Sequence, residues 1–192
     1  MAYKVLNNIS LKDVSSSGLS SLKTDMLVLV INKNTRSDSS FKELNAVSKS
    51  YILKTISSHL KDPGSSVLLP KIDGIGAENI LLIKGLEEDV PTHKWISMYQ
   101  LIAHKGNQLK ANDISVMPGT VAPKSKDQFW LVEMVAKTIE SNVYIFSETK
   151  NKTVKKPSVK KLIVLTSNLS GSSLSKAKKS VKKGYAIGEG VN

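Results

Sequence analysis

The strongest constraint on the fold is an apolar run, rich in β-branched side chains, that makes up most of the segment 25–31. A strand with one face in water alternates polar and apolar residues, so a continuous run predicts a strand covered on both faces. Further short apolar runs occur at 67–69, 80–83, 114–117 and 162–165, and helical periodicity separates most of them. The chain is therefore expected to be an α/β layered domain with a mainly parallel or mixed sheet.

The remaining elements follow from periodicity and from breaking residues. Asp73 to Ala77 predicts a hairpin-like turn between two strands, and Thr92 is expected to be a helix N-cap. In chain order we expect a short strand near 3–6, strand 25–31, helix 41–60, strands 67–69 and 80–83, helix 92–109, strand 114–117, helix 128–139 with a continuation to 146, strand 162–165, and a helix from 174 to the end.

Size and composition exclude several classes of protein. The chain has 192 residues and is 40% hydrophobic, which suits one domain with a real core. The absence of cysteine excludes disulfides, thiolate zinc sites and a catalytic cysteine. No apolar run reaches the length of a membrane span, and the N-terminus lacks a signal-peptide pattern. We therefore expect a cytoplasmic protein with no membrane partner.

The positive charge is concentrated near the end of the chain. Of the net charge of +12, residues 150–192 contribute eleven Lys against one Glu. This segment could be a solvated lysine-rich face, or it could bind DNA without sequence specificity. Arg36 is the single arginine, and no aromatic residue is interleaved with these lysines, so base-specific reading is not indicated. The candidate nucleic-acid residues are Lys155, Lys156, Lys160, Lys161, Lys178, Lys179, Lys182 and Lys183.

No motif for catalysis, cofactor binding or metal binding emerges from the residues. His59, His93 and His104 show no zinc-helix spacing, and a surface role is expected for them. The acidic run 87–89 is expected to be a solvated loop, because adjacent carboxylates point in different directions. The glycines of 73–77 match neither a dinucleotide fingerprint nor a phosphate-binding loop. We predict no catalytic, cofactor-binding or metal-binding residues in this chain.

Several segments, in a shared order, resemble the cytosol (leucyl) aminopeptidases. The end of the chain, 186–192, is similar to the "A-x-x-E-G-x-N" run of the helix that links the two domains of that family. Residues 44–52 resemble its "LDKASKGYL" helix, with Ser50 where the family usually has Gly. Segments 65–69 and 77–86 resemble its "ETLLL" and "AERVLLVGLG" strands. Residues 144–156, followed by 160–162, resemble its "YRFDKYKSKKK…KKL" passage, although Ile145-Phe146-Ser147 replace Arg-Phe-Asp.

The resemblance implies an N-terminal domain with a macro-domain-like, three-layer fold, a mixed sheet between helices. It implies that residues 1–170 form this domain and that 171–192 is an interdomain helix, cut at the start of the catalytic domain. The family's "NTDAEGR" signature, and with it the ligands for two divalent metals (Mn or Zn), is absent here. The isolated chain is therefore expected to be inactive, and the full-length enzyme to release N-terminal amino acids from peptide substrates. The implied partners are the chain's own catalytic domain and the neighbouring subunits of a homohexamer, where the domain would help assembly and shape active-site access.

Two other functions remain to be weighed against this one. Some relatives bind DNA through their N-terminal domains, which gives the basic C-terminal quarter a second interpretation. The macro-like fold also suggests ADP-ribose binding, but the glycine-rich phosphate loops of such domains are missing here. Fold resemblance alone does not transfer a function.

Overall fold

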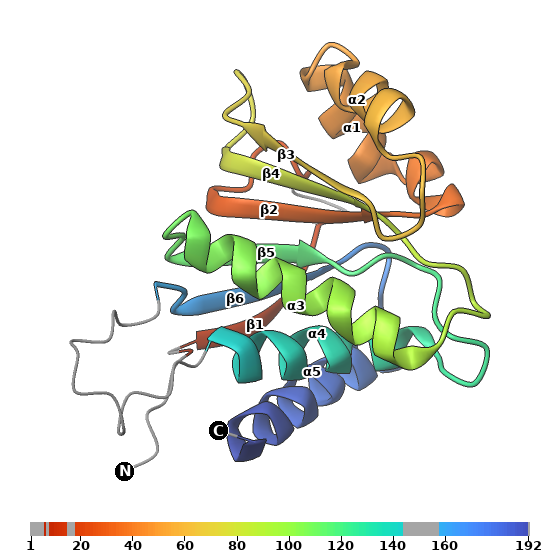
Figure 1. Ribbon diagram of the computed structural model, residues 1–192, viewed down its shortest axis with the longest axis vertical. Helices are drawn as coiled ribbons and strands as arrows, with labels where there is room; N and C mark the ends of the chain where they lie inside the picture. The colour runs from red at the N-terminus through yellow and green to blue at the C-terminus, as the bar shows by residue number, and fades with distance from the viewer. Residues whose placement is uncertain (1–5, 7, 15–17, 144–157, 192) are drawn as a thin grey trace.

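The computed structural model describes residue 6 and residues 8–14, 18–143 and 158–191. Six strands, one short 3-10 helix (η1) and five α-helices are seen in these residues (Figure 1). They are β1 (Asn8–Asp13), β2 (Thr24–Ile31), η1 (Lys33–Ser37), α1 (Ser39–Val47), α2 (Tyr51–His59), β3 (Ser66–Pro70), β4 (Ala77–Lys84), α3 (Thr92–Gln108), β5 (Asp113–Met117), α4 (Gln128–Val143), β6 (Lys161–Thr166) and α5 (Gly171–Val191).

The six strands form one mixed sheet in the order β1-β6-β5-β2-β4-β3. β3 runs antiparallel to β4, whereas the other neighbouring strands are parallel. The turn at Asp73 to Ala77 joins β3 and β4, as the glycine pattern predicted. The parallel strands bring their carboxyl ends to a single edge of the sheet, and that edge is where α/β domains commonly bind ligands.

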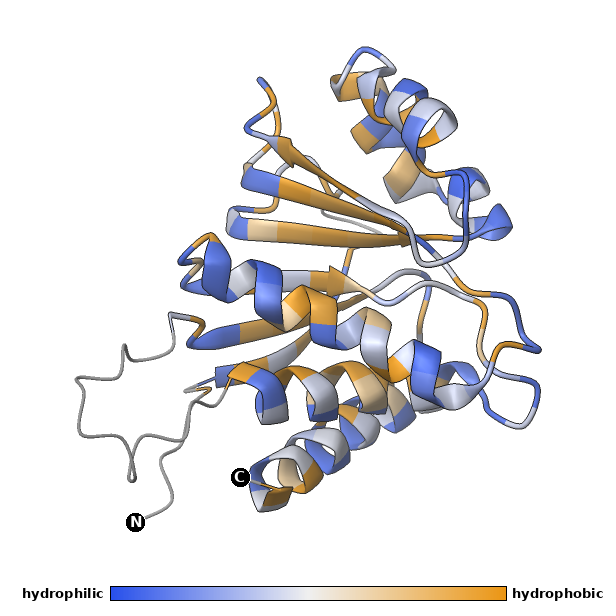
Figure 2. Ribbon diagram, in the orientation of Figure 1, coloured by the Kyte–Doolittle hydropathy of each residue, from blue (hydrophilic) through white to orange (hydrophobic). Residues whose placement is uncertain are grey.

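The sheet separates two apolar cores, and β2 at its centre contributes to both. Val28 and Val30 belong to the core under α3 and α4, whereas Leu27 and Leu29 belong to the core under α1 and α2. Figure 2 shows the apolar strands between helices whose outer surfaces are polar. This confirms the expected three-layer α/β fold with a mixed sheet between helices.

The single helix expected over 41–60 is two helices. Lys49 and Ser50 have φ values of 50° and 63°, which ends α1 and starts α2 in a new direction. The apolar periodicity continues through the break, because Leu44, Ile52 and Ile56 all reach the same core. The periodicity therefore predicted the buried face correctly but gave no sign of the break between α1 and α2.

One other boundary differs from expectation, and two others fall at least partly outside the described residues. Thr92 is the first residue of α3 rather than its N-cap, which is Pro91 and makes no side-chain cap. The expected strand near 3–6 lies mostly outside the described residues, in which Leu6 is buried outside any strand and β1 is the first strand. α4 ends at Val143, and the expected continuation to 146 lies outside the described residues. No helix in the described part of the chain is long and apolar enough to span a membrane.

The last helix, α5, packs along α4 through small residues. Its buried positions are Ala177, Val181, Gly184 and Gly188, which repeat at three- and four-residue spacing. A Cβ atom on Gly184 would collide with the carbonyl oxygen of Glu133, and one on Gly188 would lie 2.7 Å from that of Lys137. These two glycines therefore allow the backbones of α4 and α5 to approach closely. The assignment of 171–192 as an interdomain helix stays a prediction.

Candidate functional site

The main cleft of the described structure lies at the carboxyl ends of β2 and β4. From β2 the chain leaves toward α1 and α2 on one face of the sheet, whereas from β4 and β5 it leaves toward α3 and α4 on the other (Figure 1). Diverging connections of this kind open a crevice at the strand ends. The cleft measures about 840 Å³. Its lining comprises Ile31, Asn32, Lys33, Asn34, Arg36, Ile56, Leu60, Lys84, Gly85, Glu87, Glu88, Asp89, Val121 and Lys124.

Asn32, the residue directly after β2, is fixed on the cleft floor. Its carboxamide fits between two glycines that follow the neighbouring strands: a Cβ on Gly85 would collide with Nδ2, and one on Gly119 would lie 2.5 Å from Oδ1. The Thr120 amide donates a hydrogen bond to Oδ1 (3.4 Å), and the Gly85 amide donates one to the Ile31 carbonyl (2.9 Å). The sequence pattern did not single out Asn32. A polar residue directly after a strand, matched by glycines after the adjacent strands, was the available signal.

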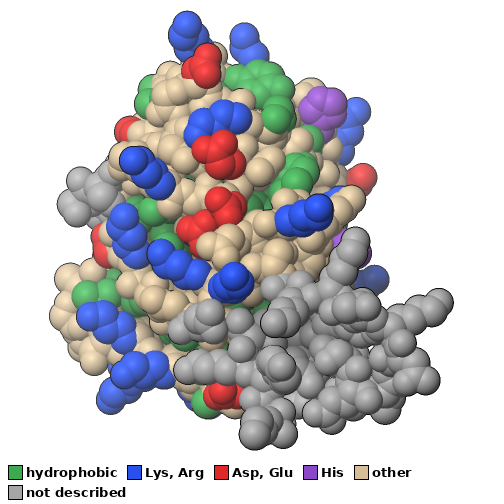
Figure 3. Space-filling view, turned by 90° about the vertical axis from the view of Figure 1, so that its left-hand side faces the viewer, with side chains coloured by type: hydrophobic (Ala, Val, Ile, Leu, Met, Phe, Trp, Pro, Cys, Tyr) green, Lys and Arg blue, Asp and Glu red, His purple; other side chains and the backbone are tan. Residues whose placement is uncertain are grey.

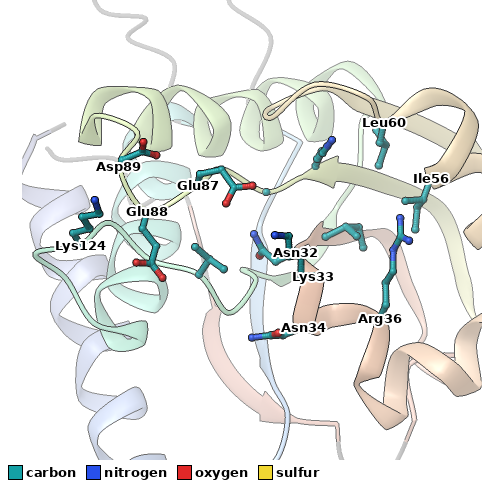
Figure 4. A pocket seen from close by; sticks show the side chains of 14 residues that line it. Asn32, Lys33, Asn34, Arg36, Ile56, Leu60, Glu87, Glu88, Asp89 and Lys124 are labelled. Carbon is teal, nitrogen blue, oxygen red and sulfur yellow. The ribbon is translucent and has the colours of Figure 1, made fainter.

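The walls of the cleft carry charges of both signs (Figure 4). The basic residues are Lys33, Arg36, Lys84 and Lys124, and the acidic residues are Glu87, Glu88 and Asp89. Lys84 donates to the backbone carbonyl of Lys61, and the Lys124 amide donates to the Glu88 carbonyl (3.0 Å). Among the described residues, ion pairs form only outside the cleft, so its opposite charges do not neutralise one another by direct contact. These charged groups can therefore form ion pairs with a ligand.

The expectations for the acidic and histidine residues hold. Glu87, Glu88 and Asp89 are exposed in the loop between β4 and α3, and His59, His93 and His104 are exposed on helices. In the residues that the structure describes, no three His, Cys, Asp or Glu side chains are grouped so that they could hold a metal ion. The described residues thus do not fit the two-metal site that the aminopeptidase resemblance implies for a full-length enzyme.

Six of the eight candidate nucleic-acid lysines lie in the part of the chain that the structure describes. Lys155 and Lys156 lie outside the described residues. Lys160 and Lys161 lie at the amino end of β6, where the Lys160 amide donates to the Asn112 carbonyl (2.8 Å). Basic and acidic side chains are interspersed on the face at the amino ends of the strands (Figure 3). In the part of this face that the structure describes, the lysines thus have acidic neighbours.

The other four lysines, Lys178, Lys179, Lys182 and Lys183, are exposed on α5. Their i, i+4 spacing makes two pairs of helix-surface neighbours. Lys183 forms an ion pair with Glu133 of α4 (3.1 Å). Nearby, the ammonium of Lys176 lies 6.0 Å from the centre of the Phe129 ring. An aromatic ring thus adjoins the basic helix in space, although none is interleaved with it in sequence.

The pKa values of two tyrosine phenols are raised by their surroundings. Burial raises the pKa of Tyr99, whose hydroxyl donates to the Pro118 carbonyl (3.4 Å). Burial, and then the carboxylates of Glu140 and Glu189, raise the pKa of Tyr185 to about 12. The Tyr185 hydroxyl donates to the Leu6 carbonyl (3.3 Å), which ties α5 to the start of the described chain. Both phenols thus bond to backbone carbonyls, and neither lines the main cleft.

Known proteins resemble the chain in sequence and in fold. A probable cytosol aminopeptidase of Methylobacillus flagellatus is 26% identical over 68% of this chain and 26% of its own length. That of Paraburkholderia phymatum is 25% identical over 93% of this chain and 36% of its own length. The chain thus spans about a quarter to a third of the curated relatives that it matches. No family model matches it.

Solved structures share the fold at low identity. Tomato leucine aminopeptidase, as its K354E mutant, superposes with a TM-score of 0.60 and 17% identity, over 90% of this chain and 35% of the other. The Trypanosoma brucei macrodomain in complex with ADP-ribose superposes with a TM-score of 0.63 and 11% identity, over 94% and 70% of the two chains. The macro-domain-like fold and the resemblance inferred from the sequence are both confirmed. The chain is similar to the N-terminal part of the cytosol aminopeptidases.

Proposed function

We propose that the chain is the non-catalytic N-terminal domain of a leucyl aminopeptidase. The observation that carries the proposal is the sequence similarity to cytosol aminopeptidases over up to 93% of the chain, against about a third of their length. The fold shared with tomato leucine aminopeptidase agrees with it. The described residues supply no metal-ligand group, so in this proposal the chemistry belongs to another part of the polypeptide.

The proposal includes a role for the domain in the full-length enzyme. That enzyme would be a cytoplasmic homohexamer that uses two divalent metals, manganese or zinc, to release N-terminal residues from peptides. The domain would support assembly and shape access to the active sites, with α5 leading into the catalytic domain. Because the described residues do not fit the metals, we derive no metal-dependent step for this chain.

Two measurements test this proposal. The purified 192-residue chain should not hydrolyse leucine-p-nitroanilide, with or without Mn²⁺ or Zn²⁺. The gene should continue in frame beyond codon 192 into a segment with the acidic metal ligands, and the longer protein should be active and hexameric by light scattering. Metal-dependent turnover that co-purifies with the short chain through several columns would overturn the assignment, as would a longer protein without peptidase activity.

A further inference from the structure

We propose that the cleft at the carboxyl ends of β2 and β4 binds a small dipolar ligand, a free amino acid or dipeptide that carries both an ammonium and a carboxylate. This goes beyond the proposed function, because it assigns a binding site to a domain for which no chemistry is proposed. It is also independent of that function, because it rests on the cleft of this chain alone.

Charges of opposite sign lie on the two sides of the cleft. Arg36 on η1 and Glu88 on the loop after β4 lie on opposite sides of Asn32 in Figure 4. Among the described residues, neither forms an ion pair within 4.0 Å. A purely anionic ligand would meet the acidic loop, and a purely cationic one would meet Arg36 and Lys33. A ligand with one charge of each sign satisfies both sides.

The cleft also offers apolar surface beside its charges. Ile56 of α2 and Leu60, directly after α2, lie on the same side of the cleft as Arg36 (Figure 4), and Val121 also lines the cleft. The cleft volume of about 840 Å³ falls in the range of small-molecule sites. A dipeptide extends only about 7 Å along its backbone, so its side chains can contact these apolar residues while its ends reach the charges.

Asn32 gives the cleft a fixed polar group between its charged sides. Asn32 is held between Gly85 and Gly119, so its carboxamide keeps one position at the diverging strand ends. A fixed amide is suited to hydrogen-bond the peptide or carboxylate group of a bound ligand without an ordering cost. Because Arg36 and Glu88 are exposed, each charge contact should contribute modestly, so affinity is expected in the millimolar range.

The test is a titration followed by amide chemical shifts in the isolated chain. Leu-Leu is the probe, compared with N-acetyl-Leu-Leu, which lacks the ammonium, with Leu-Leu-amide, which lacks the carboxylate, and with ADP-ribose. We expect saturable shifts at Asn32, Gly85 and Glu88 with Leu-Leu, and about threefold weaker binding of each blocked peptide.

Two cleft variants and one matched control sharpen the result. Glu88→Gln should remove the preference for a free ammonium, and Arg36→Gln the preference for a free carboxylate. Glu78→Gln, an exposed carboxylate outside the cleft that pairs with Lys71, should change neither preference. Absence of saturable shifts, equal binding of the blocked peptides, or tighter binding of ADP-ribose than Leu-Leu in this cleft would overturn the proposal. None of these outcomes bears on aminopeptidase parentage, which is tested by turnover and gene sequence.

Discussion

Gly184 shows how a single residue can decide the packing of two helices. Glycine is a poor helix former, yet α5 carries three glycines in its last eight positions. Two of them face α4, where a side chain would meet backbone atoms, and the third, Gly190, has open space around it. The same residue type therefore stabilises the helix packing at two positions and only weakens the helix at the third.

This contrast gives a matched pair of substitutions. Gly184→Ala should destabilise the domain by about 2 kcal/mol, because the new methyl group forces α5 away from the Glu133 carbonyl. Gly190→Ala, in the same helix, should be neutral or stabilising by up to about 1 kcal/mol. Urea unfolding followed by circular dichroism measures both. Equal changes in the unfolding free energy for the two substitutions would contradict the close approach of α4 and α5 at Gly184.

The phenol of Tyr185 should make stability depend on pH in the alkaline range. Its pKa is about 12 in the folded chain and about 10 when the chain is unfolded, so folding favours the neutral phenol. This contribution is complete below about pH 10 and is lost as pH rises toward about 12. The unfolding free energy of the parent should therefore fall more steeply between pH 9 and about 11.5 than that of Tyr185→Phe. Parallel curves would contradict the shift, and Tyr99, present in both proteins, cancels from the comparison.

At the scale of elements, the junction between α1 and α2 rests on strained residues. Ser50 adopts a left-handed conformation (φ 63°) directly before α2, at a position where the resembled family usually has glycine. A side chain costs roughly 1–2 kcal/mol in that conformation, whereas glycine adopts it freely. The resemblance and the backbone angle thus point to the same requirement for a turn.

Replacing this serine should therefore stabilise the protein. Ser50→Gly is expected to raise the unfolding free energy by about 0.5–1 kcal/mol, after allowing for the extra freedom of glycine in the unfolded chain. Ser57→Gly, in the middle of α2, should instead lower it by about 0.5 kcal/mol. Thermal unfolding of the two variants and the parent measures both effects. A Ser50→Gly variant less stable than the parent would contradict the left-handed conformation of Ser50.

The sequence predicted strands better than helix ends, for a physical reason. The central residues of β2 and β4 are buried on both faces of the sheet, so a continuous apolar run marks each of these strands in the sequence. The break at Lys49 and Ser50 depends on backbone angles that no apolar pattern encodes. At the start of α3, the N-cap is Pro91 rather than the expected Thr92. Asn32 was missed because its position depends on glycines more than fifty residues away in sequence, brought beside it by the sheet.

At the scale of the whole molecule, the uneven charge allows a test of DNA binding. Replacing Lys178, Lys179, Lys182 and Lys183 by glutamine removes four of the five exposed lysines of α5. If this face binds duplex DNA, the slope of log affinity against log salt should fall by up to about 0.9 per lysine. A control with Lys42, Lys49, Lys54 and Lys61 replaced removes equal charge from the side of α1 and α2. Fluorescence anisotropy between about 50 and 200 mM salt separates the two, and absence of binding at 50 mM would exclude this function.

The pairing of β1 with β6 has a consequence for how the protein is made. Asn8 lies opposite Lys161, so in the sheet that the described residues form, an edge strand from the beginning of the chain pairs with a strand near its end. During synthesis, β2, β3, β4 and β5 can assemble while β1 has nothing to pair with. The ribosome must therefore deliver most of the polypeptide before this first strand can dock, and until then β1 is an unpaired edge that a nascent-chain chaperone could cover.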